Sequence, residues 1–307
     1  MKKPVPFAGC FTKTANDATK TPWVFLGIAD DTQSTYLHGP AEAPEAMRQA
    51  YDGNCFNATT ESGVDLAESV LDLGDLRPRE NWEASARVYR ARLEELWKSG
   101  KVPFVAGGDH AITVPVVAAA EVLGAPIHVV QVDAHPDLYP DFEGNPSSHA
   151  CTGARIVEMS HVESLSQLGI RTMSAAQHAQ RDRYQDKLFI YEARDLPGAL
   201  PELRHIPEGA SVYVTIDIDG IDPAFAPGVS HPVPGGLSAR QVLDFLGRGH
   251  WTLIGMDVVE VSPPRDFQSQ TAILGARLLH EGMGYAARTS SAKSSSSQGT
   301  PEKRLNR

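Results

Sequence analysis

The stretch IHVVQVDAHPDLYP, residues 127–140, joins an apolar run to a segment rich in charged side chains. Residues 127–132 are mostly apolar, which is typical of a strand that is buried on both faces. Asp133, His135 and Asp137 follow at once. A buried strand that ends in two carboxylates and an imidazole favours a site at the carboxyl edge of a parallel sheet, where loops converge.

Similar apolar runs recur along the chain and alternate with helical patterns. Strands are predicted at residues 23–28, 102–107, 127–133, 187–192, 211–217 and 252–261. Helices are predicted at residues 43–51, 81–100, 113–123, 238–248 and 270–286. Because strands and helices alternate, we predict an α/β fold whose mainly parallel sheet is covered by helices on both faces.

The chain divides into a long folded region and a short polar tail. Residues 1–287 are long enough for one large α/β domain. Residues 288–307 read RTSSAKSSSSQGTPEKRLNR and hold almost no apolar side chain. Such a segment cannot bury enough surface to offset the entropy lost on ordering, so we predict a disordered Ser-rich C-terminal tail.

Charge and cysteine content argue against several classes of partner. The formal net charge of −10 repels nucleic-acid phosphates and anionic lipid surfaces, so we expect neither nucleic acid nor a membrane as a partner. Cys10, Cys55 and Cys151 are widely spaced and suggest reduced thiols. The N-terminal segment lacks the apolar core of a signal peptide, and no apolar run reaches membrane-spanning length. We therefore expect a cytoplasmic protein.

Charged side chains also gather at the ends of three further predicted strands. They are Asp109 and His110 after residues 102–107, Asp217, Asp219 and Asp222 at the end of 211–217, and Asp257 and Glu260 late in 252–261. One aspartate at a strand end often only caps the next turn. Four such clusters at one edge of a parallel sheet instead indicate a shared site.

The spacing within these clusters favours bound metal ions. Side chains at i and i+2 point to the same side of a strand, so Asp133 can act with His135, and Asp217 with Asp219. Crowded carboxylates repel one another unless cations lie between them. Carboxylates with imidazole suit Mn²⁺, and imidazole also suits Ni²⁺ or Zn²⁺, while the lack of cysteine argues against a structural zinc site.

Taken in order, these segments resemble the ureohydrolases, the arginase and agmatinase superfamily, and in particular its agmatinase-like branch. The segments are GGDH at 107–110, DAHPD at 133–137, SHA at 148–150, DIDGIDPAFAPG at 217–228 and GMDVVEVSP at 255–263. The resemblance covers residues 24–286. It implies a three-layer α/β/α arginase-like domain with two divalent metal ions, Mn²⁺ first and Ni²⁺ as the alternative.

The resemblance also implies which residues hold each ion. The set for one ion is His110, Asp133, Asp137 and Asp217, and the set for the other is Asp133, His135, Asp217 and Asp219. Asp133 and Asp217 would then bridge the two ions. Each of these positions carries a competent ligand, which argues against an inactive, non-catalytic partner subunit.

Catalytic roles follow from the same resemblance. Asp137 would orient the attacking water, whose pKa two divalent ions lower. Glu260 would pair with the planar guanidinium, and His149 would assist proton transfer to the departing amine. The alternatives are a strand-end salt bridge for Glu260 and a solvated loop side chain for His149. The predicted reaction is hydrolysis of a small guanidino compound to urea and an amine, with a deacetylase as the rival class of metallohydrolase.

The substrate tail is left open between two readings. Asp141 and Glu143 could pair with a distal amine, which favours an agmatine-like substrate. Tyr36, Leu37 and His38 replace the arginine-glycine element common in agmatinases, which favours a compact alkylated guanidine, or a biguanide or dimethylguanidine. No basic group is evident for an α-carboxylate, so we predict a substrate other than arginine. The resemblance further implies a trimer or hexamer, with or without a paralogous subunit.

Overall fold

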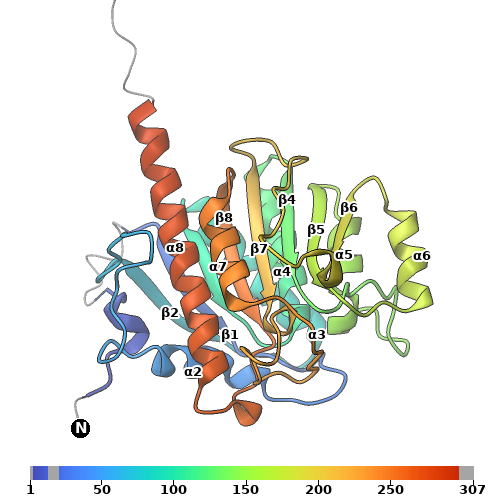
Figure 1. Ribbon diagram of the computed structural model, residues 1–307, viewed down its shortest axis with the longest axis horizontal. Coiled ribbons are helices and arrows are strands. Elements are labelled where there is room, and N and C mark those ends of the chain that lie inside the picture. Colours follow the sequence, from blue (N-terminus) through green and yellow to red (C-terminus); the bar gives the residue numbers. More distant parts are fainter. Residues whose placement is uncertain (1–2, 13–20, 297–307) are drawn as a thin grey trace, which may run out of the picture.

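The computed structural model describes residues 3–12 and 21–296, which form an eight-stranded sheet between helical layers (Figure 1). The strands are β1 Trp23–Ile28, β2 Val70–Leu76, β3 Val102–Ala106, β4 Ile127–Val132, β5 Val162–Ile170, β6 Leu188–Glu192, β7 Ser211–Asp217 and β8 Thr252–Val259. Their order is β2-β1-β3-β8-β7-β4-β5-β6, and every neighbouring pair is parallel. This arrangement confirms the predicted α/β class with a parallel sheet.

Helices cover both faces of the sheet. On one face α2 (Ala43–Ala50), α7 (Ala239–Arg248) and α8 (Gln270–Ser296) pack together, and on the other α3 (Trp82–Lys98) contacts α4 (Thr113–Ala119), which contacts α5 (Thr152–Glu158). Helix α6 (Ala175–Arg183) lies beyond β6 at the edge of the sheet (Figure 1). The short 3₁₀ helices are η1 Pro6–Gly9, η2 Pro40–Glu42, η3 His110–Ile112, η4 Ala120–Leu123, η5 His149–Cys151, η6 Ala193–Asp195, η7 Ile218–Gly220 and η8 Pro263–Arg265.

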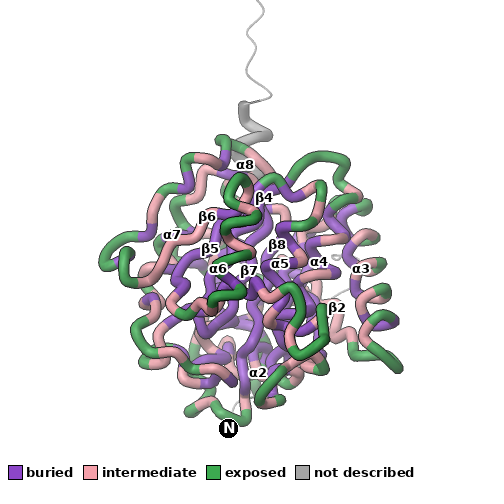
Figure 2. Tube along the Cα trace, turned by 90° about the vertical axis from the view of Figure 1, so that its right-hand side faces the viewer, coloured by how far each residue is buried: buried purple, intermediate pink, exposed green. Residues whose placement is uncertain are grey.

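The two layers enclose separate hydrophobic cores, which fill because successive strand residues point to opposite faces. On β1, Val24 and Leu26 pack in the core under α3 and α4, whereas Phe25 packs in the core under α2 and α8. Figure 2 shows the central strands as buried, whereas exposed residues lie on the outer loops and on helices such as α3 and α6. The sheet is therefore covered on both faces and meets solvent chiefly at its edges and strand ends.

Strands β2 and β5 are absent from the sequence prediction. In β2 the apolar residues alternate with Asp72 and Asp75, whose carboxylates pair with Arg48 of α2. In β5 the apolar pattern is broken by Ser164 and Gln167, which are nevertheless buried because they hydrogen-bond to side chains of β4. Both strands are stabilised by partners that are distant in sequence, so no local pattern reveals them.

The C-terminal helix α8 extends beyond residue 287, the end of the predicted folded region. Helix α8 continues to Ser296 instead of ending near residue 287, and residues 297–307 lie outside the described part. Arg288 donates a hydrogen bond to the Gly247 carbonyl, and the Thr289 hydroxyl bonds to the Tyr285 carbonyl of the preceding turn. A docked helix can propagate through polar residues because each added residue closes one more backbone hydrogen bond without a new nucleus.

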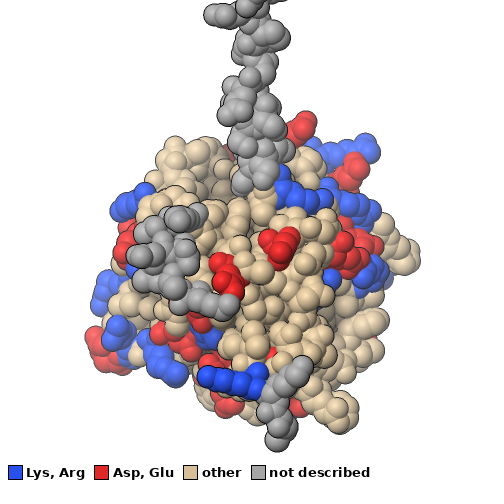
Figure 3. Space-filling view, turned by 90° about the vertical axis from the view of Figure 1, so that its left-hand side faces the viewer, with Lys and Arg blue, Asp and Glu red and all other residues tan. Residues whose placement is uncertain are grey.

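The surface shows no single-sign field on the face drawn in Figure 3, where acidic and basic side chains are interspersed. Among the described residues, no helix combines the length and apolar character needed to cross a membrane.

Candidate metal centre and its pocket

Four adjacent strands deliver the charged residues to one edge of the sheet. Strands β3, β8, β7 and β4 are neighbours in that order. His110 follows β3, and Glu260 follows β8. Asp217 ends β7 and Asp219 follows it, while the segment 133–137 follows β4. A Cβ on Gly220 would approach the Asp133 backbone N to 2.6 Å, so only glycine lets the turn after β7 pack this closely against the end of β4.

One group of ligands surrounds His110. Its Nδ1 atom lies 3.0 Å from Oδ2 of Asp137, 3.1 Å from Oδ2 of Asp133 and 3.4 Å from Oδ2 of Asp217. The imidazole is fully buried, and its Nε2 lies 3.0 Å from the Thr215 hydroxyl. Within the described part of the chain, Nδ1 has no hydrogen-bond partner. A buried nitrogen that faces three carboxylate oxygens and has no partner has the chemistry of a metal ligand.

A second group shares Asp133 with the first. His135 Nδ1 lies 3.1 Å from Oδ2 of Asp219 and 3.7 Å from Oδ1 of Asp133. Asp133, His135 and Asp219 can thus converge on one ion, as can His110, Asp133 and Asp137. Asp217 adjoins the first group through His110 and accepts a hydrogen bond from the Asp219 backbone through Oδ1 at 3.0 Å. The structure therefore gathers the predicted ligands, whereas bridging by Asp217 stays a prediction.

The buried carboxylates of the centre repel one another, and bound cations would reduce this repulsion. Burial raises the pKa of Asp217 well above its usual value, and the charges of Asp219 and Asp133 raise it further. Burial and then the charge of Asp133 raise the pKa of Asp137 to about 6. Burial opposes ionisation of Asp133 too, but the adjacent imidazoles of His110 and His135 hold its pKa below the usual range. Divalent ions would relieve this crowding, so the oxygen and nitrogen donors fit a binuclear site.

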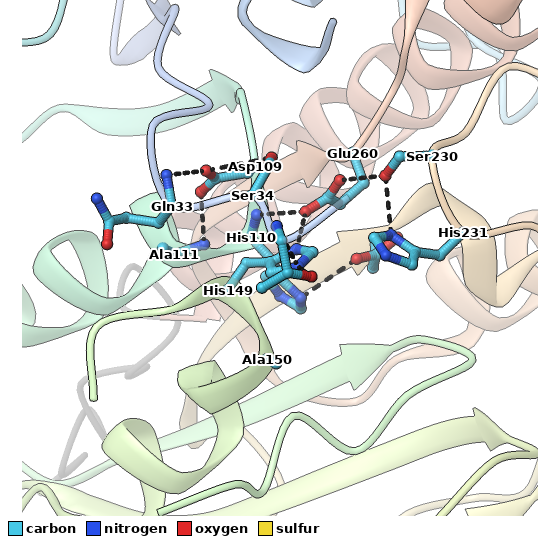
Figure 4. A network of polar contacts seen from close by, with 12 residues as sticks. Gln33, Ser34, Asp109, His110, Ala111, His149, Ala150, Ser230, His231 and Glu260 are labelled. Carbon is cyan, nitrogen blue, oxygen red and sulfur yellow. Dashed lines mark hydrogen bonds and ion pairs between the residues drawn. The ribbon is translucent and has the colours of Figure 1, made fainter. Parts of the chain in front are cut away.

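Glu260 and His149 form a buried pair beside the ligands (Figure 4). Glu260 Oε1 accepts hydrogen bonds from the His149 Nδ1–H at 2.7 Å and from the His110 backbone N–H at 2.9 Å. Glu260 adopts a φ of 62° and Asp137 a φ of 50°, in a region of backbone conformation that is uncommon for non-glycine residues. The predicted catalytic residues are therefore close together, and neither Glu260 nor His149 is a solvated side chain.

The second nitrogen of His149 contacts the loop that follows β1. The Thr35 backbone N–H lies 3.2 Å from Nε2, and the Thr35 hydroxyl lies 2.8 Å from it. Burial lowers the pKa of His149, but the adjacent Glu260 carboxylate raises it to about 9. In the neutral ring, Nε2 carries a lone pair and can accept the hydrogen bond from the Thr35 N–H. In the protonated ring, Nε2 carries a hydrogen and can donate it to the Thr35 hydroxyl. In both protonation states Nδ1 carries the hydrogen that is donated to Glu260.

These groups open into a pocket of about 170 Å³. Its lining includes the candidate residues His135, Asp137, His149, Asp217, Asp219 and Glu260, and also Thr35, Tyr139, Phe142, Ala150, Gln177 and His231. Sequence analysis missed this second set, because its members come from loops and a helix start that carry no periodic pattern. The ring of His231 lies beside two candidate residues, 5.3 Å from His149 and 6.0 Å from His135 between ring centroids.

The residues proposed to read the substrate tail do not line this pocket. Asp141 and Glu143 are exposed, and Asp141 accepts a hydrogen bond from the Gly144 backbone. His38 turns to Asp31, with its Nδ1 3.0 Å from the Asp31 carbonyl. Tyr36 is exposed and packs against His231, with ring centroids 5.5 Å apart. Of this group, Tyr36 alone has a described contact with a pocket-lining residue.

Other acidic residues at the strand ends have structural contacts. Asp109 accepts a hydrogen bond from the Ala111 backbone and so caps η3, and it also accepts from the Gln33 backbone (Figure 4). Asp222 accepts backbone hydrogen bonds from Ala224 and Gly235 in the turn after β7. Asp109 is thus a helix-capping residue and Asp222 a turn residue.

Comparisons with known proteins agree with this geometry. Residues 21–284 match the model of the Arginase family. The chain is 39% identical to arginase 1 of Arabidopsis thaliana over 274 residues, 83% of this chain and 78% of that protein. It is 31% identical to guanidinobutyrase of Pseudomonas aeruginosa over 267 residues, 84% of each chain. The solved agmatine ureohydrolase of Thermoplasma volcanium superposes with a TM-score of 0.78 at 28% identity and covers 95% of this chain and 97% of its own.

Proposed function

Because the chain belongs to the arginase family of metal-dependent ureohydrolases, on its agmatinase-like branch, we propose that it hydrolyses a small guanidino compound to urea and an amine. One observation carries this proposal. Members of both groups of potential metal ligands line the same pocket as the Glu260–His149 pair. The pocket thus combines carboxylates that can attract a guanidinium with a histidine, His149, that can transfer a proton.

The ions would be held by His110, Asp133, Asp137 and Asp217 on one side and by Asp133, His135, Asp217 and Asp219 on the other. We propose Mn²⁺, with Ni²⁺ as the alternative, because carboxylate oxygens outnumber imidazole nitrogens in this set. When bound, two divalent ions lower the pKa of water so that a nucleophile forms near neutral pH.

Glu260 is suited to hold the guanidinium. Its Oε1 accepts hydrogen bonds from His149 and His110, whereas the one contact of Oε2 among the described residues is with the Ser230 hydroxyl at 3.4 Å. A carboxylate oxygen accepts more than one hydrogen bond, so Oε2 keeps capacity for the N–H edge of a guanidinium. Asp137, on the same pocket, is placed to accept a hydrogen bond from the attacking water and orient it.

His149 is suited to pass a proton to the departing amine. Glu260 holds the proton on Nδ1, and Thr35 lies within hydrogen-bond distance of Nε2. An imidazole fixed at both nitrogens presents one orientation to the substrate, which favours general acid catalysis.

Two classes of substrate tail each have support. Among the residues that line the described pocket there is no Lys or Arg, which favours a tail without a carboxylate, as in agmatine-like compounds and small alkylated guanidines. Arginine is favoured by the Arabidopsis relative, which is an arginase. The lining of the pocket is a property of this chain itself, so we propose the non-carboxylate class.

A urea-release assay of Mn²⁺-loaded and Ni²⁺-loaded protein separates these candidates. The panel is arginine, agmatine, guanidinobutyrate, guanidinopropionate, methylated guanidines and biguanides, and the readout is kcat/KM. The highest value for agmatine or an alkylated guanidine supports the proposed class, and the highest value for arginine refutes it. Release of acetate from acetylated amines without urea would favour a deacetylase.

The assembly and location of the protein are also proposals. We propose a homo-oligomer, a trimer or hexamer, in the cytoplasm. Light scattering after gel filtration gives the mass of the assembly for comparison with the 33.2 kDa chain. A monomer at micromolar concentration would contradict the oligomer.

A further inference from the structure

Two buried glutamines lie behind the candidate metal centre, and no role described above uses them. Gln131 of β4 and Gln167 of β5 are register partners in the sheet, and neither side chain has exposed surface. In the interior of a sheet, a buried amide is costly unless its polar atoms are hydrogen-bonded. The described partners of both amide N–H groups lie on the side of the candidate metal ligands, whereas Oε1 of Gln167 has no described partner.

The hydrogen bonds form a chain that ends on Asp133. The Gln167 amide donates to Oε1 of Gln131 at 2.9 Å, and the Gln131 amide donates to Oδ2 of Asp133 at 2.7 Å. The Gln167 amide also donates to the Pro136 carbonyl at 2.6 Å, between His135 and Asp137. Gln167 thus contacts both the residue that holds Asp133 and the backbone of the ligand segment.

Asp133 is the residue on which such a contact matters most, because it belongs to both ligand groups. Its Oδ2 lies 3.1 Å from Nδ1 of His110, and its Oδ1 accepts the backbone N–H of His135 at 2.6 Å. A carboxylate that serves two ions has one productive rotation about its Cβ–Cγ bond. Hydrogen bonds to both oxygens fix that rotation before any ion binds.

We propose that Gln131, supported by Gln167, is a positioning residue that sets the Asp133 carboxylate so that each oxygen faces its own ion. The inference rests on the proposed function, since it requires two metal sites that share Asp133. Contacts of this kind around metal ligands typically change affinity by about 10- to 100-fold when removed.

Metal affinity, rather than turnover, tests the proposal. The metal-free full-length protein is titrated with Mn²⁺ in competition with a fluorescent chelator, and both dissociation constants are fitted. Gln131→Met keeps the length of the side chain and removes the donor, so we expect at least one dissociation constant to rise by about tenfold or more. Gln167→Met removes only the support, so we expect a smaller rise at the same site.

The same two strands offer a matched control. His128 and Ser164 are also register partners on β4 and β5, are buried, and share a hydrogen bond of 2.8 Å, but no described hydrogen bond connects them to Asp133. We expect Ser164→Ala to leave both dissociation constants within about twofold of the wild type. Circular dichroism of each metal-free variant verifies folding, and if Gln131→Met is unfolded, Gln167→Met carries the test.

The outcomes separate this inference from the proposed function. Wild-type binding of two Mn²⁺ ions, weakened by Gln131→Met and not by Ser164→Ala, supports the positioning role. Unchanged affinity in both folded glutamine variants, or equal weakening by Ser164→Ala, overturns it and leaves the binuclear site standing. Failure of the wild-type protein to bind two Mn²⁺ ions overturns the proposed site and the inference together.

Discussion

Replacing Glu260 by glutamine removes one negative charge and keeps the shape of a buried side chain. The carboxylate accepts hydrogen bonds from His110 and His149 and, by our proposal, from the substrate guanidinium. Glutamine retains one acceptor oxygen but cannot form a charged pair. Because Glu260 is no ligand in either proposed metal set, we expect full metal occupancy in Glu260→Gln.

The size of the effect follows from the burial of Glu260, which is 3% exposed. Loss of one partner of a buried, hydrogen-bonded charge pair costs about 2–5 kcal/mol, and the remaining amide acceptor reduces this to about 2–4 kcal/mol. That range corresponds to a fall of roughly 30- to 1000-fold in kcat/KM.

The pH profile should change as well. Burial lowers the pKa of His149 and Glu260 raises it to about 9, so His149 donates a proton below that pH and loses this ability above it. Without the carboxylate the pKa falls, and the alkaline limb of kcat/KM should move to lower pH by at least about one unit. A profile that keeps its alkaline limb would contradict the assignment of His149 as proton donor.

The assay is urea release from pH 6 to pH 10, with metal content measured on the same samples. Glu61→Gln is the matched control, because Glu61 is paired with Arg240 on the exposed surface of α7, outside the pocket. We expect Glu61→Gln to match the wild type. A kcat/KM for Glu260→Gln within about threefold of the wild type, or loss of its metal, would refute the reasoning.

Three further outcomes are expected. Asp133→Asn should leave the protein with less than one equivalent of metal and no urea release. The control is Asp222→Asn, which changes a hydrogen-bond acceptor in a turn and should keep both ions. Elemental analysis of both variants measures the metal content. Thr35→Val removes the hydroxyl that lies 2.8 Å from His149 and should lower kcat about fivefold with little change in KM. Thr35→Ser keeps a hydroxyl and should have the kcat of the wild type. Equal steady-state constants for the two variants would contradict this role of the hydroxyl. Deletion of residues 290–307, which hold few apolar side chains, should leave Tm within about two degrees and kcat unchanged, and a larger fall would show that the segment docks.

The location of the candidate metal ligands was predictable because their signals are local. Asp133 with His135, and Asp217 with Asp219, are two residues apart at the ends of apolar runs, which assigns both pairs to strand ends, although His135 and Asp219 lie just beyond β4 and β7. The parallel sheet then brings the four strand ends together, since parallel strands all end at one edge. Motif, spacing and topology thus indicate the same site independently.

The pocket wall was not predictable for the converse reason. Tyr139, Phe142 and His231 lie in irregular segments, and Gln177 lies in the first turn of α6. Their convergence depends on how loops fold over the sheet, which no period of 2 or 3.6 residues encodes. The substrate-tail residues inferred from sequence are not among those that line the pocket, so their role stays a prediction; Asp141, for example, is exposed.

Strand β5 illustrates a third limit. Its segment VESLSQLGI carries polar residues at positions that the fold buries, so hydrophobicity alone misses the strand. Ser164 and Gln167 are buried only because β4 presents His128 and Gln131 at matching positions of the register. Pairing between strands separated by a helix therefore determines whether β5 forms and which side chains contact Asp133.

The central claim is that two divalent ions share Asp133 at the carboxyl edge of the sheet. The most direct test is an anomalous difference map, recorded near the manganese absorption edge, from crystals of the Mn²⁺-loaded protein. We predict two peaks, one beside His110 and one beside His135, with Asp133 in contact with both. A single peak, or peaks away from these histidines, would contradict the account.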